Sequence, residues 1–201
     1  MTPVKRYFRY TVYMFIYLSE RIRGIDFIMR KVNAQMYNTG CHGYNVTPYV
    51  HLRQVLTYIS QEEEVKFIDI GCGKGIVLYH ATKLNFKAIM GIDYDYELIR
   101  LAKRNFDKLK INKVELLSTD ATAFDRYSDF NYFYFNNPFS VEIFKNVLNN
   151  IVNSLSKEKR NITIICYKAP YYEHELLKNG FEIIHKIYDN IKETFTVFYR
   201  L

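Results

Sequence analysis

The sequence of 201 residues predicts an α/β fold: a mostly parallel, seven-stranded sheet whose last strand is antiparallel, with helices on both faces and an N-terminal helical extension. Short apolar segments alternate with amphipathic segments along the chain, which is the pattern of a parallel sheet. The last two apolar segments, 181–189 and 193–201, are joined by few residues, so they must pair antiparallel, because a parallel crossover needs a dozen or more. The length suits one domain. We therefore expect an N-terminal helical extension or lid, residues 1–60, and a core domain, residues 61–201.

The first segment, 4–24, predicts a long helix that is amphipathic in places. Arg9 interrupts its apolar run, which falls short of the ~20 apolar residues of a membrane span. It also lacks the small-residue cleavage site of a signal peptide. We expect the helix to pack across the domain as a lid or brace, and contact with a membrane surface through its Lys- and Arg-rich flanks is the alternative.

The remaining elements follow from local signals and periodicity. Thr47 is predicted to be an N-cap, with Pro48 in the first helical position. The expected helices are 49–60, 75–84, 96–110, 140–155 and 171–180. The expected strands are 65–70, 87–93, 114–118, 131–135, 161–167, 181–189 and 193–201.

Composition limits the class of protein and its partners. With 49% hydrophobic and 24% charged residues, the chain is typical of a globular protein with a full core. Cys41, Cys72 and Cys166 form no Cys-x-x-Cys pair and have no histidine at metal-ligand spacing, which argues against a disulfide scaffold and a metal site. We expect reduced thiols and a cytoplasmic location. The net charge of +7 leaves RNA open as a partner, although the charge is spread along the chain.

The stretch FIDIGCGKG, residues 67–75, predicts a ligand-binding turn. An apolar strand leads into Gly71, Gly73 and Gly75 and then a helix, so the backbone can approach a ligand at the carboxyl end of the sheet. A phosphate-binding P-loop is excluded because its Gly-Lys-Ser/Thr ending is missing. The dinucleotide fingerprint fits only in part, because its last glycine would fall at Ile76.

From about Val65 to its end, the chain resembles the class I S-adenosylmethionine-dependent methyltransferases, which have a Rossmann-like fold. The resemblance rests on the glycine turn, on GIDYD at the end of the second strand, on STDA after the third and on FNNPF after the fourth. It implies that Asp69 lies near the amino group of S-adenosylmethionine, that Asp93 accepts both ribose hydroxyls and that Asp120 accepts the adenine amino group. The expected cofactor-binding residues are Asp69, Gly71, Gly73, Gly75, Asp93, Tyr94, Asp120, Ala121, Asn136 and Tyr44.

The fourth motif, Asn136-Asn137-Pro138-Phe139, resembles the Asn/Asp-Pro-Pro-Tyr/Phe motif of amino-methyltransferases with one substitution. That motif holds the hydrogens of the acceptor nitrogen with a side-chain oxygen and a neighbouring backbone carbonyl, and its aromatic ring stacks on a planar acceptor. Either Asn136 or Asn137 can be the side-chain ligand, depending on the register. The alternative is a strand-to-helix turn in which Asn137 or Ser140 caps the next helix.

The segment CHGYNVTPY, residues 41–49, is similar to one in small bacterial methyltransferases that carry a Phe-Asn-Pro-Phe fourth motif. Tyr44 or Tyr49 is therefore expected to line the methyl pocket. His42 is a candidate base, although a loop histidine satisfied by backbone or solvent is the favoured interpretation. Cys72 lies inside the glycine turn, where a small side chain fits, and it is not expected to be a nucleophile.

The expected function is transfer of a methyl group from S-adenosylmethionine to a nitrogen on a small molecule, a protein side chain or an RNA base. Methyl transfer requires alignment of a lone pair with the methyl carbon more than acid–base chemistry. The alternative is a catalytically silent S-adenosylmethionine-fold binding module, associated with RNA. The sequence does not identify the acceptor or the oligomeric state.

Overall fold

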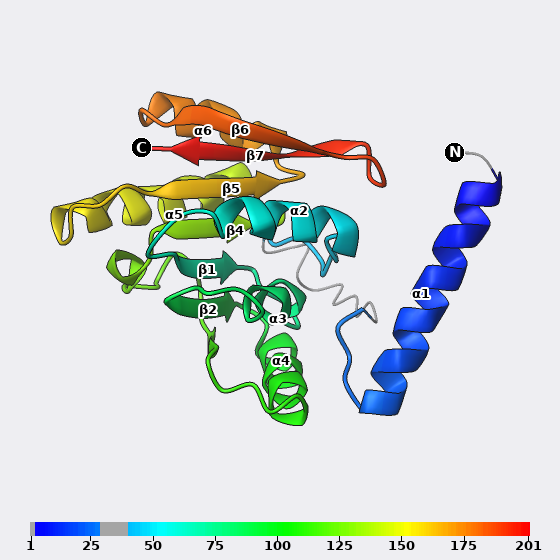
Figure 1. Cartoon of the computed structure of the whole chain (residues 1–201). Helices are drawn as coiled ribbons and strands as arrows, with labels where there is room; N and C mark the ends of the chain where they lie inside the picture. The colour runs from blue at the N-terminus through cyan, green and yellow to red at the C-terminus, as the bar shows by residue number, and fades with distance from the viewer. Residues whose placement is uncertain (1–2, 29–39) are drawn as a thin grey trace.

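The computed structural model describes residues 3–28 and 40–201 of the chain. Over these residues a seven-stranded sheet lies between two groups of helices (Figure 1). The strands are β1 (Lys66–Ile70), β2 (Ala88–Asp93), β3 (Glu115–Ser118), β4 (Tyr132–Phe135), β5 (Thr163–Tyr167), β6 (Glu182–Asp189) and β7 (Thr194–Arg200). The α-helices are α1 (Pro3–Arg23), α2 (Tyr49–Ile59), α3 (Ile76–Ala81), α4 (Tyr96–Lys108), α5 (Val141–Asn153) and α6 (Glu173–Lys178).

The strand order is β3-β2-β1-β4-β5-β7-β6. Strands β1 to β5 are parallel to one another, whereas β7 pairs antiparallel with both β5 and β6. The predicted sheet with its reversed last strand is confirmed. The order changes direction between β1 and β4, and α/β sheets bind ligands beyond the carboxyl ends of the strands at such a point.

Each face of the sheet buries its own hydrophobic core, because successive side chains of a strand point to opposite faces. On one face, Ile68 and Phe133 pack with apolar side chains of α5 and α6. On the other face, Phe67 and Tyr134 pack with α2, α3 and α4. All four side chains of β4 are buried, which explains its run of aromatic residues.

The element boundaries agree with the predicted ones to within one or two residues in most places, which is the usual disagreement at element ends. Two differences matter. Helix α3 ends at Ala81, three residues earlier than predicted. The predicted N-cap is wrong: Pro48 occupies the N-cap position of α2, and the buried hydroxyl of Thr47 bonds to the Tyr134 hydroxyl at 3.0 Å.

Helix α1 joins the domain through its last turn. The buried carboxylate of Glu20 accepts hydrogen bonds from the backbone N–H groups of Phe27 and Ile28, at 3.1 and 3.2 Å. The Phe27 ring stacks on Tyr79 of α3. Within the described ranges, no helix has both the length and the apolar character that crossing a membrane requires. The body of α1 stands apart from the sheet in Figure 1, so the expected packing of this helix across the domain is not seen. The role of residues 1–60 as a lid stays a prediction.

Candidate functional site

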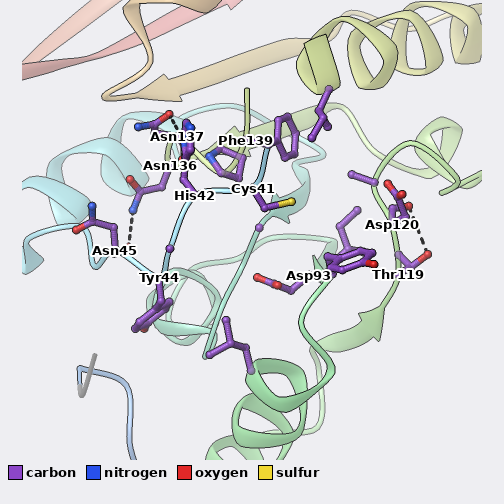
Figure 2. A pocket seen from close by; sticks show the side chains of 18 of the residues that line it. Cys41, His42, Tyr44, Asn45, Asp93, Thr119, Asp120, Asn136, Asn137 and Phe139 are labelled. Atoms are coloured by element: carbon purple, nitrogen blue, oxygen red, sulfur yellow. Dashed lines mark hydrogen bonds between the residues drawn. The ribbon is translucent and has the colours of Figure 1, made fainter. Parts of the chain in front are cut away.

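A cavity of about 290 Å³ lies at the carboxyl ends of β1, β2, β3 and β4, at the change in strand order (Figure 2). The predicted motifs after these four strands all contribute to its wall. A further wall comes from the segment before α2. The lining residues are 41–45, Gly71, 92–94, Leu98, 119–122, 136–139 and Ile143.

The glycine turn packs against both the fourth motif and the segment before α2. Gly71 has a φ of 79°, and a Cβ at this position would lie 2.5 Å from the Cβ of Pro138. Gly73 has a φ of 54°, and a Cβ there would overlap the ring of Tyr44. Only glycine combines such a backbone with such close neighbours. Gly71 lines the cavity, whereas Tyr44 covers Gly73, and Gly75 packs near Phe106.

Asp93 lies where the resemblance expects the ribose ligand. Its carboxylate accepts hydrogen bonds from the N–H groups of Gly73 at 2.7 Å and of Asp95 at 2.9 Å. Burial raises the pKa of Asp93 to about 6, although these two hydrogen bonds act in the opposite direction. A carboxylate has about four acceptor positions, so two backbone bonds leave capacity for hydroxyl groups.

The other predicted acids differ in their position. Asp120 lines the cavity and also closes a turn, because its Oδ1 accepts from the N–H and the hydroxyl of Thr122, both at 2.8 Å. Ala121 and Tyr94 line the cavity beside it. Asp69 is buried within β1 and is not among the lining residues. Burial raises the pKa of Asp69 well above its ordinary value.

The Asn136 amide is held in one orientation by its nitrogen. Nδ2 donates to the carbonyl of Asn45 at 2.9 Å and to the hydroxyl of Thr47 at 3.0 Å. The bond to Asn45 is drawn in Figure 2. The side-chain oxygen Oδ1 is buried and has no hydrogen-bond partner among the described residues. Asn136 therefore lines the cavity with a side chain whose buried oxygen is an unused acceptor.

Asn137 is held differently, by His42. The Nδ1 atom of His42 lies 2.9 Å from Asn137 Oδ1 and 3.0 Å from the Asn137 carbonyl oxygen. Both partners are acceptors, so we infer that Nδ1 carries the hydrogen. Asn137 has a φ of 48°, a left-handed conformation that asparagine tolerates. Because the Asn137 side-chain oxygen is already bonded, the geometry favours Asn136 as the ligand. His42 is satisfied by the turn, as the favoured interpretation expected.

Phe139 lines the cavity but exposes only 5% of its surface. Its ring packs at 78° to the ring of Phe135, with 6.1 Å between the centroids. The hydroxyl of Tyr172 donates to its carbonyl. Stacking of Phe139 on a planar acceptor stays a prediction.

The segment before α2 runs antiparallel to the fourth motif. An isolated bridge pairs Cys41 with Phe139, and the His42 N–H donates to the Pro138 carbonyl at 2.8 Å. Tyr44 lines the cavity, as expected, whereas Tyr49 is half exposed, packs against the ring of His80 and is not among the lining residues. The expected cavity role of Tyr49 is therefore not seen.

Sequence reasoning missed the residues that orient Asn136. Thr47 was assigned to a helix cap, and Asn45 contributes only its backbone carbonyl. No motif marks a backbone acceptor, because any residue can supply it. A threonine before a proline signals a cap more often than a contact with a strand 87 positions away.

Comparison with known proteins identifies the class. A family described as "Methyltransferase domain" matches residues 61–196, from the end of α2 into β7. The chain belongs to this family. The family gives the reaction class, methyl transfer, with S-adenosylmethionine as the methyl donor. The site fits this molecule, because Asp93 and Asp120 offer carboxylate oxygens at the cavity, which Gly71 also lines without a side chain.

Curated proteins with methyltransferase names also match part of the chain. The ribosomal protein L11 methyltransferase of Thermotoga neapolitana is 27% identical over 112 residues, which are 53% of this chain and 40% of that protein. The chain spans half or less of the length of the curated L11 methyltransferases that it matches.

Solved structures show the same fold. A ribosomal protein L11 methylase from Lactobacillus delbrueckii subsp. bulgaricus aligns with a TM-score of 0.61 and 19% identity, over 87% of this chain and 82% of that one. The tRNA (uracil-54, C5)-methyltransferase of Pyrococcus abyssi, solved with S-adenosyl-L-homocysteine, aligns with a TM-score of 0.59 and 15% identity. That alignment covers 79% of this chain and 40% of the other.

Proposed function

We propose that this methyltransferase domain methylates a nitrogen atom, and that Asn136 Oδ1 accepts a hydrogen bond from that nitrogen. The unsatisfied Oδ1 atom supports this proposal most directly. A buried acceptor without a partner costs about 1–3 kcal/mol, and such a group in a native structure calls for an explanation. A methyl-acceptor molecule whose N–H group donates to Oδ1 would remove this cost on binding.

The two hydrogen bonds of Asn136 Nδ2 fix the orientation of the amide, so its oxygen can pair only with a hydrogen-bond donor. If the amide were rotated by 180°, Oδ1 would face the Asn45 carbonyl oxygen, which lies 2.9 Å from Nδ2. Two oxygen acceptors would then oppose each other without a hydrogen between them. The amide oxygen can therefore pair with the nitrogen that accepts the methyl group, because this nitrogen carries hydrogen. A carboxylate carries none and would not pair with it.

A second hydrogen-bond acceptor, a backbone carbonyl, lies one residue further along the chain. The Asn137 carbonyl oxygen has two lone pairs, and His42 Nδ1 occupies one of them at 3.0 Å. In the Asn136 register this carbonyl corresponds to the backbone acceptor of the amino-methyltransferase motif. Two acceptors can hold both hydrogens of an amino group, which turns its lone pair toward the methyl donor and contributes through orientation.

The chemistry needs no acid or base from the chain in the transfer step. When bound, S-adenosylmethionine supplies an electrophilic methyl carbon on a sulfonium. Transfer of this methyl group to the nitrogen lone pair would leave the carbon–sulfur electron pair on sulfur, and the methylated nitrogen would release one proton to solvent. The residues of the chain align the nitrogen and exclude water.

The first experiment separates an enzyme from a silent binding module. Calorimetry with S-adenosylmethionine and S-adenosylhomocysteine should show binding to the wild type and loss of binding in Asp93→Ala. If neither compound binds the wild type, the methyltransferase assignment of this site fails. Binding without turnover on any acceptor would instead favour the silent module.

The second experiment identifies the acceptor. Incubation with methyl-labelled donor and the protein, RNA and small-molecule fractions of a cell extract should label one fraction. The names of the L11 relatives favour a protein acceptor, whereas the net charge of +7 favours RNA. On the labelled fraction, Asn136→Ala should lose at least 100-fold in turnover, while the exposed Asn149→Ala on α5 should not change it. Wild-type turnover by Asn136→Ala, or a methyl group found on carbon or oxygen, would overturn the nitrogen proposal.

A further inference from the structure

Helix α1 carries an exposed apolar stripe on one side. Met14, Phe15, Leu18 and Ile22 are 57%, 75%, 47% and 87% exposed. At 3.6 residues per turn their positions fall within an arc of about 100°, which is the width of the buried face of an ordinary amphipathic helix. In Figure 1, the body of α1 stands apart from the sheet and the other helices. This stripe is therefore a face of the kind that is normally covered.

The end of α1 is bonded to the residues that follow it, and Phe27 among them stacks on Tyr79 of α3, so the stripe has a defined direction. Glu20 is buried and accepts the N–H groups of Phe27 and Ile28. The N–H of Ile25 also bonds to the Glu20 carbonyl at 2.9 Å. These contacts lie on the side of the helix opposite Phe15, because residues 15 and 20 are separated by about 140° around the helix axis. The stripe faces away from the anchored side.

The charges of α1 indicate what covers the stripe. The helix sequence contains five basic residues, Lys5, Arg6, Arg9, Arg21 and Arg23, against one acidic residue, Glu20. Glu20 points inward, where its carboxylate is occupied by backbone N–H groups. The sequence of α1 is therefore basic, and the exposed Arg21 and Arg23 carry positive charge in its last turn, which an anionic surface complements.

We propose that α1 binds the surface of a membrane that contains anionic lipid, with its axis in the plane of that surface. The stripe enters the boundary between headgroups and acyl chains, and Arg21, which borders the stripe, contacts the lipid phosphates. Amphipathic helices with large apolar residues on one face and Lys or Arg elsewhere bind membranes in this way. Long basic side chains keep their charge in the headgroup layer while their stems lie against apolar groups. The inference is independent of the acceptor nitrogen.

The test uses the full chain and vesicles of stated composition. Co-sedimentation should show binding to vesicles of equal parts phosphatidylglycerol and phosphatidylcholine, at least tenfold tighter than to phosphatidylcholine alone. The double substitution Phe15→Ser/Ile22→Ser should weaken this binding at least tenfold, because it removes two large apolar groups. Arg21→Gln should weaken binding to the anionic vesicles by about fivefold, and 0.5 M salt should weaken it further.

The control is Leu177→Ser, which removes an exposed leucine from α6 without touching α1. It should bind vesicles as the wild type does, and circular dichroism should show that all variants are folded. Equal binding by Phe15→Ser/Ile22→Ser and the wild type would overturn the proposal. So would light scattering that shows a wild-type dimer and a monomeric double variant, because the stripe would then be covered by a second copy of the chain. Loss of RNA binding in that variant with unchanged vesicle binding would also overturn it.

Discussion

The ammonium group of Lys74 lies 2.6 Å from the carboxylate of Asp26, and the Lys74 side chain is fully buried. Lys74 belongs to the glycine turn that lines the cofactor side of the site, whereas Asp26 follows α1. The Asn105 side chain accepts from the Asp26 N–H and donates to the carbonyls of Asp26 and Lys74. Lys74 Nζ also lies 5.4 Å from the centre of the Tyr44 ring. Asp26, 48 positions before Lys74, is thereby bonded to the glycine turn.

Replacing Asp26 with asparagine should destabilise the domain by about 3 kcal/mol, because it leaves a buried ammonium group without its carboxylate. For a chain of this size, that loss corresponds to a fall in Tm of about 10 °C. Thermal unfolding measures it. The double variant Asp26→Asn/Lys74→Met should recover most of the loss, and Glu64→Gln, which opens an exposed pair with Lys87, should leave Tm unchanged. An unaltered Tm in Asp26→Asn would show that the pair contributes nothing.

Replacing Asn136 with aspartate should reduce kcat by at least about 100-fold, although related motifs accept either residue. A carboxylate oxygen would take the place of Nδ2 and oppose the Asn45 carbonyl at about 2.9 Å. The misplaced side chain would no longer align the nitrogen. Steady-state kinetics on the identified acceptor, with donor affinity measured separately, checks this. Activity within threefold of wild type would mean that the Nδ2 bonds do not orient the site.

Replacing Thr47 with valine should lower kcat by about tenfold and leave the affinity for S-adenosylmethionine unchanged. The valine removes one of the two acceptors of Asn136 Nδ2 and leaves the Tyr134 hydroxyl without its partner. The second effect costs about 1–3 kcal/mol of stability. Thr47→Ser keeps the hydroxyl and should behave as wild type in both measurements. A threonine that only supported the fold would lower Tm in Thr47→Val while kcat of the folded fraction stayed constant.

The affinity for S-adenosylmethionine should fall as the pH decreases through about 6. Burial raises the pKa of Asp93 to about 6, and only its ionised form offers all its oxygens as acceptors. Above this pH the binding capacity is present, and at pH 5 about nine tenths of Asp93 is protonated, so Kd should rise about tenfold. Calorimetry between pH 5 and 8 measures the change. Asp93→Asn should bind weakly at every pH, and a pH dependence that persists in this variant would assign the titration to another group.

Most of the fold was predictable because its signals are local. The alternation of strands and helices, the short connection before β7 and the glycine turn each depend on neighbouring residues. The cap of α2 was not predictable in the same way. Thr47 has the sequence context of a cap, but the Tyr134 hydroxyl on β4 and the Asn136 amide compete for its oxygen. Tertiary contacts outweighed a local preference.

The sequence predicts which strand ends form the candidate site, but it does not predict the hydrogen bonds between the side chains there. Asp93, Asp120 and Asn136 line one cavity because carboxyl ends of parallel strands meet at one edge of the sheet. The choice between Asn136 and Asn137 depended on which side-chain oxygen His42 occupies, and sequence spacing carries no information about that. The Asp26–Lys74 pair was likewise invisible, because an aspartate after a basic helix has no motif.

The position of residues 41–44 has a consequence for the binding of two substrates. These four consecutive residues contact Phe139 and the Asn137 carbonyl at one end and cover Gly73 with Tyr44 at the other. A methyl donor that contacts Tyr44 is therefore expected to shift the wall that we propose for the acceptor nitrogen. Because such coupling is reciprocal, each substrate is expected to change the Kd of the other by the same factor.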